Sequence, residues 1–198
     1  MADPTHFTQH AAHVIHQAEL EATLLHSRSI DAEHLLLALC EEQEGLGAAI
    51  LHEDLHLETT HVRAIVHLVS GKFVTASAEG DAKPATAASL SDALFWAAEE
   101  AQSANHHWIG TEHLLLGLAH TRDKVVLEIF KRLNLRPEEI RAKVHARVPE
   151  IPLQVNQRAK LKDRFWTEFY HNFTYYVPQP IRRLFGRFLD ASKMPPLG

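Results

Sequence analysis

The residues of this chain that could support chemistry are two Glu-His pairs, a group of histidines and one cysteine. Glu33-His34 and Glu112-His113 each lead an apolar run. A carboxylate beside an imidazole can serve acid-base catalysis, but neither pair belongs to a catalytic pattern, so no catalytic residue is predicted. A carboxylate in the first turn of a helix also stabilises that helix through the macrodipole alone. Both histidines are interpreted as structural, with their rings reaching backbone carbonyls.

Histidine is abundant, with 16 residues in the chain. His10, His13 and His16 follow an i, i+3, i+6 spacing, so His10 and His13 could share one metal ion. No H-E-x-x-H motif is present and no Cys or Asp joins the group, so we interpret these positions as a solvated helix face and predict no metal site. The excess of histidine could also make the surface charge respond to mild acidification. Cys40, in an apolar run, is interpreted as a buried small hydrophobic residue.

The elements that position the Glu-His pairs form an internal repeat. "IDAEHLLLAL" at 30–39 returns as "IGTEHLLLGL" at 109–118, an offset of 79 residues. Apolar residues before each phrase recur with helical spacing, and two further helical stretches follow it. The pattern predicts an all-α fold of two four-helix repeats about a pseudo-two-fold axis, with repeat 1 over about 6–70, a linker over about 71–86 and repeat 2 over about 87–148. One extra residue, assigned to Asp54, separates the two copies.

Composition and charge divide the chain near residue 150. Residues 1–150 carry 12 basic and 22 acidic residues, a net charge of −10, whereas residues 151–198 carry 8 and 3, a net charge of +5. No run of about 18 apolar residues and no basic, apolar start is present, so we expect a cytoplasmic protein without a membrane span or signal peptide. The acidic body argues against nucleic acid as a partner.

The basic segment 151–198 is predicted to form amphipathic helices. It concentrates aromatic residues, and five of them are expected to mediate packing or self-association: Phe165, Trp166, Phe169, Phe185 and Phe188. Three interpretations remain open for this tail: packing on the repeats, docking on a partner or a second copy, and lying on an anionic membrane. Packing or self-association is favoured and the membrane is ranked last.

The repeated phrases, together with "FTQHAAHVIHQA" at 7–18, resemble the double repeat of the Clp N-terminal domain family, as found in ClpC and ClpA. The resemblance covers roughly residues 6–148. It implies an all-α domain that does no chemistry and recruits substrates and adaptors for an unfoldase. Because no G-x-x-x-x-G-K-[ST] phosphate loop occurs, we expect a free-standing accessory protein of a Clp system, not an enzyme and without a cofactor. The expected partners are Clp ATPase or peptidase subunits, protein substrates or adaptors.

ClpC-like members also recognise phosphorylated arginine, and the resemblance assigns residues to such a site. In repeat 1 it implies Thr8 for the phosphoryl group and Glu33 for the guanidinium group; in repeat 2 it implies Glu112, with Ala87 where Thr8 would stand. The prediction is therefore an intact site in repeat 1 and a degraded site in repeat 2. The rival hypothesis is a self-associating structural or membrane-surface protein that uses the same scaffold and the amphipathic tail.

Overall fold

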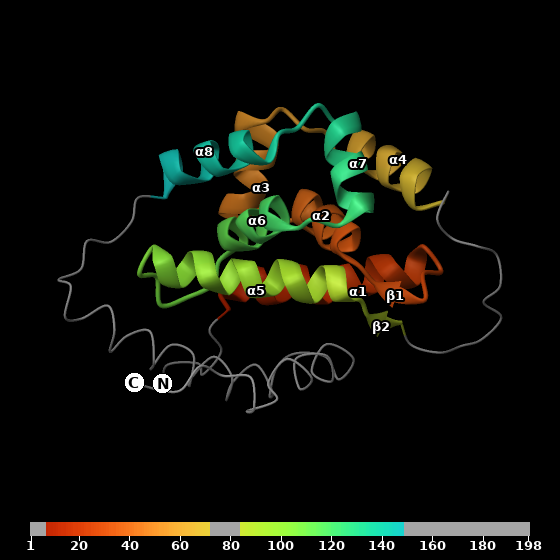
Figure 1. The fold of residues 1–198 in the computed structure, drawn as a ribbon, viewed down its shortest axis with the longest axis horizontal. Coiled ribbons are helices and arrows are strands. Elements are labelled where there is room, and N and C mark those ends of the chain that lie inside the picture. Colours follow the sequence, from red (N-terminus) through yellow and green to blue (C-terminus); the bar gives the residue numbers. More distant parts are fainter. Residues whose placement is uncertain (1–6, 72–83, 149–198) are drawn as a thin grey trace.

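The computed structural model describes residues 7–71 and 84–148, and these residues are largely helical (Figure 1). The first repeat contains α1 (Gln9–Leu24), α2 (Ala32–Glu41), α3 (Leu46–Ala49), the π-helical turn η1 (Ile50–Asp54) and α4 (Thr59–Ser70). The second repeat contains α5 (Ala88–Ser103), α6 (Thr111–His120), α7 (Lys124–Arg132) and α8 (Pro137–Arg147). With α3 and η1 taken together, the predicted all-α fold of two four-helix repeats is confirmed. The basic segment 151–198 lies outside the described residues.

The helices are arranged in layers related by the internal repeat. In Figure 1, α1 and α5 form one outer layer, α2 and α6 the middle, and the remaining helices the opposite side. Helix α1 packs on α2 as α5 packs on α6, and the two middle helices touch each other. Helix α4 packs on α7, and α8 packs on η1. None of the helices described is long and apolar enough to cross a membrane.

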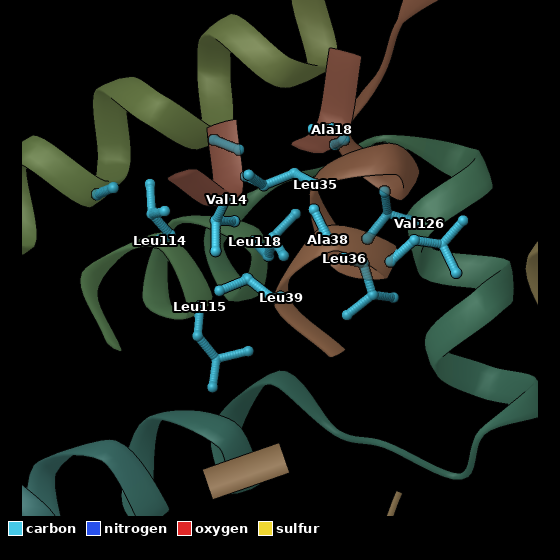
Figure 2. Packing of buried hydrophobic residues seen from close by; sticks show 14 of the residues in the cluster. Val14, Ala18, Leu35, Leu36, Ala38, Leu39, Leu114, Leu115, Leu118 and Val126 are labelled. Atoms are coloured by element: carbon cyan, nitrogen blue, oxygen red, sulfur yellow. The ribbon is translucent and has the colours of Figure 1, made fainter. Parts of the chain in front are cut away.

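The leucines of the two repeated phrases form the centre of the core. All six of those predicted to face inward are fully buried: Leu35, Leu36, Leu39, Leu114, Leu115 and Leu118. Figure 2 shows them meeting Val14 and Ala18 of α1 and Val126 of α7. Apolar residues at this spacing form one stripe on a helix, and burying that stripe drives the packing of the layers.

The one-residue difference between the repeats is absorbed by the π-helical turn. The N–H of Leu55 donates to the carbonyl of Ile50, five residues back, at 3.0 Å. At the same place in the second repeat, the N–H of Leu133 donates to the carbonyl of Ile129, four residues back, at 2.9 Å. A π-helical turn holds one residue more than an α-helical turn. The extra residue assigned to Asp54 lies in this turn.

The start of each repeat is attached to the other repeat by a short parallel strand pairing that the sequence did not predict. Strand β1 (Ser29–Ile30) pairs with β2 (Ala85–Thr86), and Phe7 forms a parallel bridge with Ile109. The two pairings are equivalent under the internal repeat. They place the beginning of α5 on the loop before α2, and the beginning of α1 on the loop before α6.

Candidate functional site

Thr8 lies against the second repeat. It is the N-cap of α1, and its Oγ1 accepts the N–H of Ala11 at 3.2 Å. Its own N–H donates to the carbonyl of Ile109 at 3.0 Å. An N-cap leaves the first N–H groups of its helix directed outward, so the start of α1 is suited to an anion.

Thr8 and Glu33 lie apart in the structure, and the binding roles that the resemblance gave them stay a prediction. Helices α1 and α2 run antiparallel. This direction is evident from the 2.8 Å hydrogen bond between His13, near the start of α1, and Glu42, just after the end of α2. Glu33 lies at the beginning of α2, nine residues earlier, which is about 13 Å along the helix. The pseudo-two-fold axis therefore separates the two residues that the resemblance placed together.

Glu112 is the glutamate that adjoins the loop bonded to Thr8. It follows Gly110, the N-cap of α6, which is next to the Ile109 that bonds Thr8. The side chain of Glu112 folds back over Gly110: a Cβ added there would lie 2.2 Å from its Oε1. Only 16% of this side chain is exposed. We call Thr8, Ile109, Gly110 and Glu112 the Thr8 junction.

The equivalent place in the other half, the Ala87 junction, consists of Ala87, Ile30, Asp31 and Glu33. The N–H of Ala87 donates to the carbonyl of Ile30 at 3.0 Å. Ala87 caps α5 without a side-chain bond, and Asp31 stands where the Thr8 junction has Gly110.

Asp31 places a carboxylate at the first turn of α5. Its Oδ1 accepts the hydroxyl of Ser89 at 3.1 Å. The contrast between "DAEH" and "GTEH" was the available sequence signal for this difference, and the sequence analysis did not use it.

The two glutamates carry opposite pKa shifts. Burial, reinforced by the negative charges of Asp31 and Asp123, raises the pKa of Glu33 to about 7. Burial alone would also raise the pKa of Glu112, but its contact with His113, whose Nδ1 lies 3.1 Å from Oε1, and a backbone hydrogen bond outweigh burial, so that pKa is lowered. At neutral pH Glu112 is an anion, whereas about half of Glu33 is protonated.

The two histidines of the repeated phrases are structural, but they bond a different group from the one predicted. Nδ1 of His34 accepts the N–H of Asp31, and Nδ1 of His113 accepts the N–H of Gly110, both at 2.9 Å. Each imidazole thus accepts the N–H of the N-cap residue at its helix start instead of reaching a carbonyl. The Nε2 atoms lie 3.1 Å from the hydroxyl of Ser27 and 2.8 Å from Nδ1 of His106, respectively.

The Ala87 junction also contains a compact group of potential metal ligands. Asp31, Glu33 and His34 offer ligand atoms within 4.8 Å of one another. Both ring nitrogens of His34 are already hydrogen-bonded, to the N–H of Asp31 and to Ser27. The imidazole has no lone pair left for a metal without breaking its bond to the N–H of Asp31, so this group does not fit a metal ion.

The predicted contact residues of the tail, Phe165, Trp166, Phe169, Phe185 and Phe188, lie outside the described residues. Within the described part, the fold and the two junctions define a helical double-repeat domain. Its paired helix starts are each completed by the opposite repeat.

The Clp repeat N-terminal domain matches this chain twice, over residues 6–94 and 85–165. The chain belongs to this family, as the sequence resemblance predicted. A probable ATP-binding subunit of the ATP-dependent Clp protease from Chlamydia pneumoniae is 32% identical over 149 residues, which cover 75% of this chain and 17% of that protein. The ATP-binding subunit ClpC of Staphylococcus aureus strain USA300 is 30% identical over 138 residues, which cover 69% of this chain and 16% of that protein. The chain thus spans only about a sixth of the length of these relatives.

Solved structures agree on the fold. The N-terminal domain of the chaperone ClpD from Arabidopsis thaliana has a TM-score of 0.57 at 22% identity, covering 71% of this chain and 93% of that chain. The Hsp104 N-terminal domain from Candida albicans has a TM-score of 0.59 at 19% identity, and the match covers 77% of this chain and 97% of that chain.

Proposed function

We propose that this chain is a non-enzymatic binding module of a Clp protease system, and that it recognises phosphorylated arginine at the Thr8 junction. Family membership and relatives that are ATP-binding subunits of Clp proteases support the Clp role. The observation that carries the ligand assignment is the contact between the start of α1 and the loop just before α6, over which the side chain of Glu112 folds.

The Thr8 junction offers what each end of a phosphoarginine side chain needs. A phosphoryl group is stabilised by the N–H groups and positive dipole end of a long helix, and α1 has 16 residues and a threonine N-cap. A guanidinium group forms its strongest hydrogen bonds with a carboxylate, and the lowered pKa keeps Glu112 ionised. The partial burial of Glu112 reduces the competition from water for that bond.

The Ala87 junction is the poorer site for the same ligand. The hydroxyl of Ser89 holds the carboxylate of Asp31 at the first turn of α5, where a phosphoryl group would bind. The negative charge of this carboxylate would repel the phosphoryl group. Glu33, with its pKa raised to about 7, is a weak partner for a guanidinium group at neutral pH. The preferred carboxylate is therefore Glu112, the reverse of the preference inferred from the sequence.

Titration calorimetry with a phosphoarginine-containing peptide tests this assignment. Glu112→Gln should weaken binding about 10- to 100-fold, because a charge-assisted hydrogen bond contributes roughly 1.5–3 kcal/mol. Glu33→Gln, its equivalent in the other repeat, is the matched control and should bind within about twofold of the native chain. A native chain that does not bind, or a larger loss from Glu33→Gln, contradicts the assignment. Peptides with unmodified arginine or phosphoserine show whether both ends of the ligand are required.

The Clp role has a separate test. The full chain, immobilised, should retain the Clp ATPase of its host, and the peptidase only through that ATPase. Retention of neither subunit under conditions in which a phosphoarginine peptide binds would separate the ligand assignment from the Clp assignment.

A further inference from the structure

We propose that His10, His13 and Glu42 form a binding site for a divalent transition-metal ion such as Zn²⁺. The inference does not depend on the proposed function. Nδ1 of His13 lies 2.8 Å from Oε2 of Glu42, and Nδ1 of His10 lies 3.5 Å from Oε1 of the same carboxylate. The sequence showed the two histidines but not the carboxylate. Glu42 lies 29 residues after His13, at the end of α2.

The three side chains are placed by the packing of α1 on α2. His10 and His13 are three residues apart on α1, so they lie on one face of the helix. Glu42 is the C-cap of α2 and its side chain is only 8% exposed, against 43% and 61% for the two imidazoles. The N–H of Glu44 donates to its Oε1 at 3.3 Å. A fixed carboxylate thus forms the floor of the group, and two imidazoles cover it on the solvent side.

Two imidazoles and one carboxylate are a ligand set that Zn²⁺ accepts in proteins, with water in the remaining position. Nickel and copper ions also bind imidazole strongly, so they serve as probes. The imidazoles approach different oxygens of the carboxylate, and His10, His13 and Glu42 are not among the described residues whose ligand atoms already lie within 4.8 Å of one another. Because both rings are largely exposed, they can rotate to bring their nitrogens to one ion, and any proton on the coordinating nitrogens passes to solvent.

The site belongs to the first repeat only. By the repeat offset, the positions of His10, His13 and Glu42 are taken in the second repeat by Ser89, Asp92 and Thr121. Those three do not form a ligand set for Zn²⁺. A metal ion at the first site would join the first two turns of α1 to the end of α2, close to Thr8.

The test is Zn²⁺ binding by the full, chelator-treated chain, measured by competition with a chromophoric chelator. Because the chain has 16 histidines, the comparison between variants carries the result. His13→Gln and Glu42→Gln should each weaken the tightest site about tenfold or more. His16→Gln is the matched control, since His16 is 64% exposed on the same helix and its nearest carboxylate, Glu19, is 4.0 Å away. It should leave the affinity unchanged.

A spectroscopic measurement identifies the ligands independently of affinity. Electron paramagnetic resonance of the chain with one equivalent of Cu²⁺ should show two nitrogen ligands, and one in His13→Gln. The proposal is overturned if His13→Gln and Glu42→Gln bind Zn²⁺ as the native chain does. It is equally overturned if His16→Gln weakens binding as much, because the tight site would then lie elsewhere.

Discussion

Oγ1 of Thr111 accepts a hydrogen bond from the backbone N–H of Gly47 at 2.9 Å, in a buried contact that joins the two repeats. Thr111 begins α6 and Gly47 lies in α3, so the bond connects elements 64 residues apart. A Cβ on Gly47 would lie 2.6 Å from the carbonyl oxygen of Thr111, so the backbones approach too closely for a larger residue. The first repeat is thus fitted to the second through its smallest residue.

Replacing Thr111 by Val should destabilise the domain by about 1–3 kcal/mol, because the N–H of Gly47 would be left buried without an acceptor. Chemical denaturation followed by circular dichroism measures the change. Thr60→Val, at an exposed position of α4, is the control and should stay within about 0.5 kcal/mol of the native chain. A neutral Thr111→Val would show that the bond contributes nothing to the joining of the repeats.

Leu115 tests the core. It is fully buried and belongs to the cluster in Figure 2, so Leu115→Ala should cost roughly 2–5 kcal/mol of unfolding free energy. Leu127→Ala, at a position 42% exposed on α7, should cost much less. Equal losses from the two variants in denaturant titrations would contradict this assignment of inward and outward faces.

The repeat made most of this core predictable, because "HLLLAL" and "HLLLGL" give both the helical period and the pairing of equivalent positions. The grouping of the site residues was not predictable in the same way. A linear alignment places Thr8 with Glu33, whereas the pseudo-two-fold axis carries Thr8 to the Ile109 loop of the other repeat. The contact of His10 and His13 with Glu42 was missed for a related reason: it depends on which residue ends α2.

Glu33 should make stability depend on pH. Its pKa is raised in the folded state from 4.5 to about 7, so the folded state holds the proton more tightly than the unfolded state. Stability from this group is therefore present below about pH 4.5, is lost as pH rises towards 7, and stays lost above that value. Glu33→Gln should then stabilise the chain at pH 8 by about 2–3 kcal/mol relative to its effect at pH 4.5. Urea denaturation of both proteins at the two pH values measures this difference, and a pH-independent effect would contradict it.

The basic tail remains a prediction from charge and periodicity. If residues 151–198 cover the body, deleting them should increase the binding of an apolar dye or convert an oligomer to a monomer in light scattering. Close apolar contact must supply most of the attraction, because salt screens charge beyond about 8 Å. Leu24 of α1, 66% exposed, is among the body residues that such a contact could cover. A truncated chain without either change, with rapid proteolysis of the tail in the native chain, would exclude packing.

Liposome co-sedimentation of the full chain and the truncated chain distinguishes the membrane-surface alternative. Binding of the full chain alone to anionic vesicles would support that alternative over packing.

The location of the ligand is tested most directly by two-dimensional amide NMR of the chain titrated with phosphoarginine. The Thr8 junction predicts that the largest shifts fall on the amides of residues 8–11 and 109–113. Residues 87–90 and 30–34, the equivalent segments of the Ala87 junction, should shift little at the same ligand concentration. Larger shifts in the second group, or shifts of similar size in both, would contradict the assignment of the site to Thr8 and Glu112.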